Sequence, residues 1–306
     1  MRWPFALFLL LGLSCLQASA ATYALPQGKD NMVGAIHYIT TQQEDTLVDI
    51  ARDQDVGYDA LKSANPGIDP WLPKVGASVL IPSEYILPAA PRRGIVINLP
   101  AMRLFYYPAD RAVVETFPIG IGREGWSTPL GKTKIVSKVL NPTWTPPASI
   151  RAEHAENGDP LPAVVAAGPD NPLGLYALKF AWAGYLIHGT NKPYGVGMRV
   201  SHGCIRLFPK DIESLFQQVP VGTPVEVVDQ PWLWGEREGE YYLQVFPPLH
   251  APQSSSEEEA AFRQWLQAKI PAGYEISWTE ALRILRQADG VPTLVVLRAQ
   301  STGSLL

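Results

Sequence analysis

The chain has 306 residues, a formal net charge of -4 at pH 7, and 46% hydrophobic residues. A mildly acidic chain without basic runs is a poor candidate for nucleic-acid binding, so we expect no nucleic acid among its partners. The length allows two or three domains. Its 29 prolines and 25 glycines, with short β-branched runs between them, favour a β-rich, loop-rich architecture over a helical one.

The first twenty residues have the parts of a secretory signal peptide. A basic start at Arg2 precedes an apolar run over residues 5–13, and Gln17-Ala-Ser-Ala20 fits a cleavage site. The run is too short to cross a bilayer as a helix, which takes about 20 apolar residues, and no later segment is long and apolar enough. We therefore predict removal of residues 1–20 and a soluble, exported protein. An uncleaved anchor and lipidation at Cys15 are the alternatives.

Residues 35–82 predict a small α+β module. Residues 36–39 alternate like a strand, and Thr46 supplies an N-cap for a helix with inward apolar residues at helical spacing. A second helix over residues 58–65 ends at a proline, which cannot continue it. Residues 79–82 then close the module as a strand.

A proline-dotted linker, residues 83–92, leads to a mainly β domain over residues 93–229. Its expected strands are short and separated by Gly and Pro turns: 95–99, 103–107, 113–121, 132–140 and 225–228. One helix is expected over residues 209–219. This spacing predicts an antiparallel β-sandwich or barrel-like fold.

Two long segments without regular pattern, residues 141–172 and 191–200, interrupt these strands. Loops of this length in a compact domain are usually functional or disordered, and we interpret these as walls of a substrate groove. Trp144 and Tyr194 would contact a peptide or a sugar face there, unless each simply packs beneath its loop. Arg199 would meet a carboxylate of the substrate.

Residues 230–306 predict a small α+β accessory domain. Two aromatic pairs, around residues 232–234 and 241–242, flank a Gly-Glu turn, and Ser254 caps a helix. Nothing in this region has recognisable chemistry.

Cys204 is the candidate nucleophile. The sequence has two cysteines, and Cys15 would leave with the signal peptide, so Cys204 would have no disulfide partner. His202 and Arg206 lie two residues to either side, which in an extended segment places them on the face of the thiol. Gly203 allows a sharp turn, and the amides of Gly203 and Cys204 would then face a developing oxyanion. The alternative is a cysteine that fills a core.

His188 is the candidate proton acceptor and donor. It ends an apolar run, residues 185–188, that reads as a buried strand broken by Gly189. A thiol with a pKa of about 8.5 needs such a base to react well at neutral pH. His202 suits a structural hydrogen bond as readily as catalysis. A zinc site from both histidines and Cys204 lacks a CxxC pair and a fourth ligand, so we expect no metal and no cofactor.

The pattern His188-Gly-Thr followed by Ser201-His-Gly-Cys204-Ile-Arg206 resembles the signature of L,D-transpeptidases with a YkuD-type catalytic domain. The likeness runs over residues 93–229 and is strongest to the periplasmic group that attaches an outer-membrane lipoprotein to peptidoglycan. It implies that Cys204 is the nucleophile and His188 the proton donor and acceptor. It also implies supporting roles for Ser201, His202, Gly203 and Arg206.

The module of residues 35–82 resembles a LysM domain, which binds cell-wall glycan. The two resemblances together imply a periplasmic enzyme that forms a thioester from a stem tetrapeptide and transfers the acyl group. The acceptor would be a lysine of a lipoprotein, another stem peptide or water. A papain-like peptidase would carry its cysteine before its histidine, which is not the order here. The rival hypothesis is a catalytically silent cell-wall binding protein.

Overall fold

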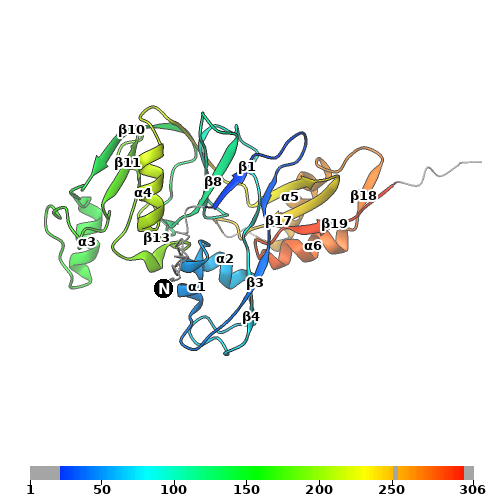
Figure 1. Ribbon diagram of the computed structural model, residues 1–306, viewed down its shortest axis with the longest axis horizontal. Helices are drawn as coiled ribbons and strands as arrows, with labels where there is room; N and C mark the ends of the chain where they lie inside the picture. The colour runs from blue at the N-terminus through cyan, green and yellow to red at the C-terminus, as the bar shows by residue number, and fades with distance from the viewer. Residues whose placement is uncertain (1–20, 251–253, 300–306) are drawn as a thin grey trace, which may run out of the picture.

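The computed structural model describes residues 21–250 and 254–299, and the expected signal peptide with Cys15 lies outside them. Figure 1 shows three parts: a β-rich central domain, a small N-terminal module (residues 37–81) beside it, and a C-terminal domain at one end of the molecule. The mainly β fold with two small α+β parts is as predicted. Within the described ranges, no helix has the length and apolarity needed to cross a bilayer.

The N-terminal module folds in the predicted order: β3 (His37–Thr40), α1 (Leu47–Asp53), α2 (Tyr58–Ala64) and β4 (Ser78–Ile81). Thr46 caps α1, because its hydroxyl accepts a hydrogen bond from the Asp49 amide at 3.1 Å. Asn65 follows α2, and its side chain bonds the backbone of Leu61 and Leu80 at 2.8 Å each, which ties the helix end to β4. Apolar residues of both helices and β4 form a separate core.

The central domain is built on a nine-stranded sheet. The strand order is β1 (Ala21–Ala24), β8 (Val113–Pro118), β7 (Arg103–Tyr107), β6 (Gly94–Asn98), β15 (Pro224–Val228), β10 (Gly131–Leu140), β11 (Tyr176–Phe180), β12 (Leu186–His188) and β14 (Ile205–Arg206). The pairs β6–β15 and β12–β14 are parallel, so the sheet is mixed where a purely antiparallel one was expected. The strands of each parallel pair are joined by long connections. A short hairpin can join only antiparallel neighbours.

The predicted helix over residues 209–219 is present as α4 (Pro209–Gln218), which packs on β11 and covers the central core. A short second sheet joins β9 (Ile121–Gly122) to β13 (Arg199–Ser201) in parallel. The first long loop holds a helix that the sequence pattern did not reveal, α3 (Ala148–Glu156). Only Ile150 of α3 is buried, so the helix has no apolar stripe from which to recognise it.

Three short strands tie the N-terminal module into the rest of the chain. Strand β1 pairs with β8 and forms the edge of the central sheet, and β2 (Met32–Gly34) pairs with β5 (Glu84–Ile86). The module is therefore an insertion between β1 and β6 of one sheet. The segment expected as a linker contains β5, all of whose residues are buried.

The C-terminal domain packs two helices, α5 (Ser255–Gln267) and α6 (Trp278–Gln287), on a sheet of β16 (Trp232–Arg237), β17 (Glu240–Val245) and β19 (Thr293–Val295). Strands β18 (Tyr274–Ile276) and β20 (Leu297–Ala299) pair beside it. Its aromatic residues lie mostly in this core, for example Trp232 edge-on to Phe262.

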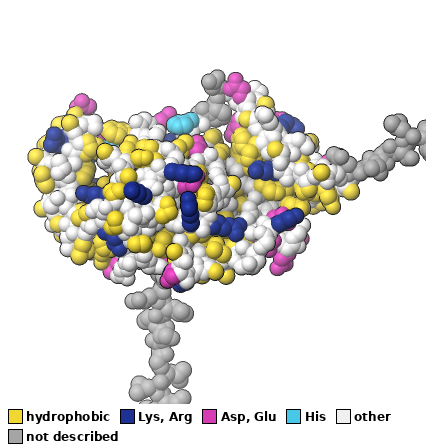
Figure 2. All heavy atoms as spheres, turned by 90° about the horizontal axis from the view of Figure 1, so that it is seen from above, with side chains coloured by type: hydrophobic (Ala, Val, Ile, Leu, Met, Phe, Trp, Pro, Cys, Tyr) yellow, Lys and Arg dark blue, Asp and Glu magenta, His cyan; other side chains and the backbone are white. Residues whose placement is uncertain are grey.

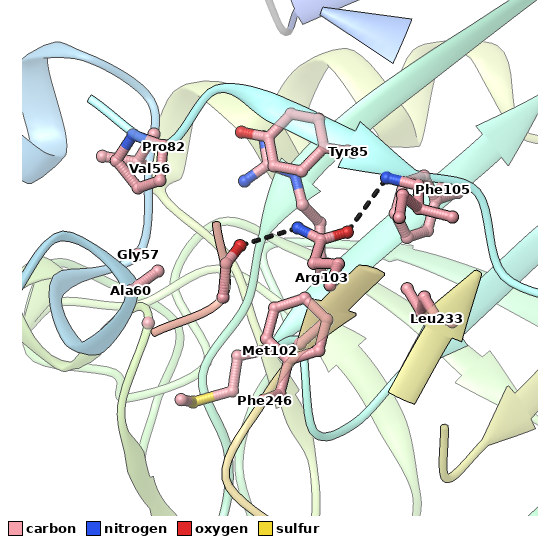
Figure 3. Close-up of a pocket in the computed structure, with 15 residues that line it drawn as sticks. Val56, Gly57, Ala60, Pro82, Tyr85, Met102, Arg103, Phe105, Leu233 and Phe246 are labelled. Atoms are coloured by element: carbon pink, nitrogen blue, oxygen red, sulfur yellow. Dashed lines mark hydrogen bonds between the residues drawn. The ribbon is translucent and has the colours of Figure 1, made fainter. Parts of the chain in front are cut away.

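All three parts meet around a void of about 20 Å³. Figure 3 shows Val56 and Gly57 of the module, Met102 of the central domain, and Leu233 and Phe246 of the C-terminal domain around it. Such a void holds about one water molecule, so the parts are closely packed here. Figure 2 shows basic side chains dispersed over one face of the molecule, with acidic ones among them.

Candidate active site

The thiol loop, residues 201–206, connects β13 to β14 and presents Cys204. Gly203 has a φ of +97°, and a Cβ built on it would lie 3.0 Å from Cε1 of Tyr185 and 3.3 Å from the Ser127 carbonyl. Both the backbone conformation and the space require glycine. The turn exposes the partly buried Cys204 thiol, whose Sγ lies 3.6 Å from the Gly184 carbonyl oxygen.

Two buried hydroxyls hold the backbone of the thiol loop. The Ser201 hydroxyl donates to the Cys204 carbonyl at 2.6 Å and accepts from the Gly203 amide at 3.2 Å. The Thr128 hydroxyl donates to the Gly203 carbonyl at 2.8 Å. The Gly203 amide, expected as an oxyanion donor, thus already has a partner inside the loop.

The sheet register brings His188 to the thiol loop. His188 pairs with Arg206 and Ile187 with Ile205 on the parallel neighbours β12 and β14. Cys204 precedes Arg206 by two residues, and its Sγ lies 3.6 Å from the Gly184 carbonyl oxygen, just ahead of β12, so the register brings the thiol beside the strand that ends at His188.

The hydrogen bond of His188 fixes which ring nitrogen is basic. Its Nδ1 lies 2.5 Å from the Gly189 carbonyl oxygen, which can only accept, so Nδ1 carries the proton. The lone pair of the neutral ring is therefore on Nε2. This is the tautomer that a general base needs, with the other nitrogen held by a backbone carbonyl.

The resting pair is a neutral thiol and a neutral imidazole. Burial and the Arg206 charge lower the pKa of His188 to about 3, against a smaller opposite effect of the Gly189 carbonyl. Burial raises the pKa of the Cys204 thiol, partly offset by the Leu186 amide and Arg206. Both shifts disfavour a preformed ion pair, so His188 would take the thiol proton only as the thiol reacts.

Arg206 is the charge that acts on both members of this pair. Its backbone exchanges two hydrogen bonds with Gly120, at 2.7 and 2.9 Å. A Cβ built on Gly195 would lie 2.7 Å from its Nη1, so the guanidinium packs against that glycine. Among the described residues its buried Nε has no partner. Arg206 is thus bonded to the neighbouring strand segment through its main chain.

His202 belongs to a cluster of side chains that reaches α3. Its Nε2 lies 3.2 Å from Glu153 Oε2 and 3.2 Å from Arg123 Nη2, and Trp126 stands edge-on to the ring. Arg123 and His202 together lower the pKa of the Glu153 carboxyl. The cluster joins α3 to the thiol loop. Nowhere in the described ranges do three or more metal-ligating side chains gather as a metal site would require.

The three expected groove residues lie in different settings. Trp144 exchanges backbone hydrogen bonds with Val165, at 2.9 and 2.7 Å, across the long loop. Tyr194 is 58% exposed and lies against α1 beside Arg52. Arg199 lines a cleft of about 670 Å³ between the module, the central domain and the C-terminal domain.

Sequence reasoning missed several residues that shape the site, above all Thr128, Glu153 and Tyr185. Thr128 and Glu153 act on the thiol loop from segments more than 45 residues away, and each looks like an ordinary loop or surface residue. No local pattern marks such contacts. Gly122 lies in a glycine-rich stretch, which is only a weak sign of a site residue. A Cβ at this position would meet the Trp126 carbonyl oxygen at 1.8 Å.

Comparison with known families agrees with this geometry. Residues 92–227 match the YkuD family, described as the L,D-transpeptidase catalytic domain. Residues 39–82 match the LysM domain, so the N-terminal module is a LysM domain. The chain belongs to the L,D-transpeptidase family and carries its catalytic domain.

Individual relatives cover most of the chain. The probable L,D-transpeptidase YbiS of Escherichia coli K12 is 46% identical over 256 residues, which are 82% of this chain and 83% of that protein. The probable L,D-transpeptidase ErfK/SrfK of the same strain is 41% identical, covering 90% and 91%. A crystal structure of an L,D-transpeptidase from Mycobacterium tuberculosis H37Rv overlaps 51% of this chain and 63% of that one, with 20% identity and a TM-score of 0.33.

Proposed function

We propose that this protein is a periplasmic L,D-transpeptidase that acts on peptidoglycan stem peptides with Cys204 as nucleophile and His188 as base. The observation that carries the proposal is the hydrogen bond from His188 Nδ1 to the Gly189 carbonyl, with Arg206 as register partner on the strand that follows Cys204. It leaves Nε2 as the nitrogen that can accept a proton, which supports His188 as the base. The LysM domain supports binding to the glycan strands of peptidoglycan, and the sequence of residues 1–20 supports export.

The first half of the reaction would form a thioester. The Cys204 sulfur gives its proton to His188 Nε2 and attacks the carbonyl carbon of the amide before the terminal D-residue of a stem tetrapeptide. Because the Gly203 amide is engaged with Ser201, the Cys204 amide is the remaining loop donor for the oxyanion. The C–N bond breaks, and His188 protonates the departing D-amino acid.

The second half would transfer the acyl group. An amine attacks the thioester carbonyl and loses a proton to His188, and the C–S bond breaks to regenerate the thiol. The resemblance favours a lysine side chain of an outer-membrane lipoprotein as the acceptor. The amine of a second stem peptide would make a cross-link, and water would make a carboxypeptidase product.

The test is the intact mass of the protein after incubation with a disaccharide tetrapeptide, with and without an amine. We expect a thioester adduct that lacks the terminal D-residue and is consumed on adding Nα-acetyl-lysine amide or a second stem peptide, whichever is the acceptor. Cys204→Ala should give neither adduct nor product while still binding sacculi. Transfer by folded Cys204→Ala would refute the nucleophile, and no adduct with a reduced, accessible wild-type thiol would favour the silent binding protein.

We propose domain limits as well: LysM over residues 35–82, a linker over 83–92 that contains the paired strand β5, a catalytic domain over 93–229 and an accessory domain over 230–306. To the catalytic domain we add β1, because it extends the same sheet.

A further inference from the structure

The N-terminal module touches the chain at Gly197, four residues ahead of the thiol loop, backbone against backbone. The Asp59 amide donates to the Gly197 carbonyl at 3.0 Å. A Cβ built on Gly197 would lie 2.2 Å from the Gly57 Cα, and one built on Gly57 would lie 3.0 Å from the Gly197 Cα. Contact this close is open only to a pair of glycines.

The segment that receives this contact leads directly into the thiol loop. On its other side, the Gly197 amide donates to the Ile119 carbonyl at 3.2 Å, and the Met198 carbonyl accepts from the Ile121 amide at 3.1 Å. The Met198 side chain packs on the core of the module. Residues 197–198 are therefore held between the module and the central domain, one residue before β13.

A second contact lies immediately downstream of the thiol loop. Phe208, which precedes α4, shares a small hollow with Val48 and Tyr58 of the module. Lys210 Nζ lies 3.6 Å from Asp55 Oδ1. Asp211 is 1% exposed, and burial together with Asp55 raises the pKa of its carboxyl well above the usual range. The module thus meets the chain on both sides of Cys204.

We propose that the N-terminal module positions the thiol loop for catalysis, and that Gly57 is the positioning residue. This inference rests on the proposed function in one respect, namely that Cys204 is the reacting group. The module does more than tether the enzyme to glycan. It packs against residues 197–198, and from there the chain runs through β13 to Cys204.

Small displacements of this support should matter, since a misplacement of about 1 Å can cost on the order of 100-fold in rate. A Cβ at position 57 requires a shift of a few tenths of an ångström against Gly197. We therefore expect about tenfold lower kcat from that change.

The test variant is Gly57→Ser. Gly57 is the N-cap of α2, where serine is at least as favourable as glycine, so the substitution adds the Cβ without weakening the helix. The matched control is Gly67→Ser in the same module, where a Cβ meets nothing within 4 Å and the backbone is not left-handed. Gly197→Ala is a second, more severe variant from the opposite side of the contact.

Four measurements separate positioning from mere stability: kcat and KM with a stem tetrapeptide, the iodoacetamide alkylation rate of Cys204 against pH, sacculus binding, and Tm. We expect Gly57→Ser to lower kcat and change the alkylation profile, with KM and sacculus binding as in Gly67→Ser. A wild-type kcat and alkylation profile in folded Gly57→Ser would overturn the proposal, as would a loss of activity matching only the unfolded fraction. If Gly197→Ala does not fold, Gly57→Ser alone decides.

The alkylation profile is independent of turnover. If Cys204→Ala retained transferase activity, the proposed function would fail, yet the alkylation rates of Gly57→Ser and Gly67→Ser would still show whether the module positions the loop.

Discussion

The neutral, buried state of His188 predicts a specific pH dependence of stability. His188 has a pKa of about 3 in the folded protein, and an unfolded histidine has a pKa of about 6.5. Between these values the unfolded chain binds a proton that the folded chain does not, so stability falls as the pH drops below about 6.5. A pH of 5 lies about 1.5 units below the unfolded pKa, so at this pH the proton bound by the unfolded chain lowers the free energy of unfolding by about 2 kcal/mol.

The variant His188→Asn tests the predicted loss of about 2 kcal/mol of stability at pH 5. Asparagine keeps a donor for the Gly189 carbonyl but does not titrate, so the variant should lose about 2 kcal/mol less than wild type between pH 7.5 and pH 5. Its absolute stability at pH 7.5 will be lower, because the smaller side chain leaves space. The comparison is therefore between the two pH differences.

The assay is urea unfolding followed by circular dichroism at both pH values, with the m-value checked for constancy. His37→Asn controls for the loss of an exposed histidine. Equal losses in wild type and His188→Asn would refute the reasoning. They would mean that His188 is accessible to protons in the folded state, and that its burial does not hold the imidazole neutral.

Two further substitutions test the electrostatics and the support of the thiol loop. In Arg206→Gln the pKa values of both Cys204 and His188 should rise, because the Arg206 charge lowers both. Alkylation against pH should shift to higher pH, and NMR should show His188 titrating at higher pH; a shift of either group in the opposite direction would contradict the assignment. Ser201→Ala should cost about 1–3 kcal/mol in urea unfolding, since it leaves the buried Gly203 amide and the Cys204 carbonyl without their partner. A loss below about 0.5 kcal/mol, as for a surface position, would show that Ser201 does not hold the loop.

Local rules of sequence predicted much of the fold. The Thr46 cap, the end of α2 at Asn65 and the Ser254 cap of α5 all depend on neighbours within four residues, and each is present. The hairpin of β6 and β7 follows from two short runs rich in β-branched and aromatic residues on either side of a turn at residues 100–102. These elements were predictable because short-range hydrogen bonding and steric limits alone determine them.

What depends on distant partners was not predictable in the same way. Strands β1 and β5 are three or four residues long, and they are strands only because β8 and β2 accept them. The Thr128 hydroxyl reaches Gly203 across 75 residues of sequence, and Glu153 reaches His202 across 49. The roles of Cys204 and His188 came from a motif, whereas the protonated nitrogen of His188 followed only from the position of the Gly189 carbonyl.

The pairing of β2 with β5 sets a rule for protein engineering. Truncating the chain ahead of β6 would remove the N-terminal module, but it would also strip β1 from the edge of the sheet and expose β8 as a bare edge, which invites aggregation. Gly34 and Glu84 face each other in antiparallel register, so their Cα atoms are about 5 Å apart. Replacing residues 35–83 with a two-residue hairpin turn would excise the module and keep all strands outside it in place. Chimeras that exchange modules between relatives have their natural junction at the same point.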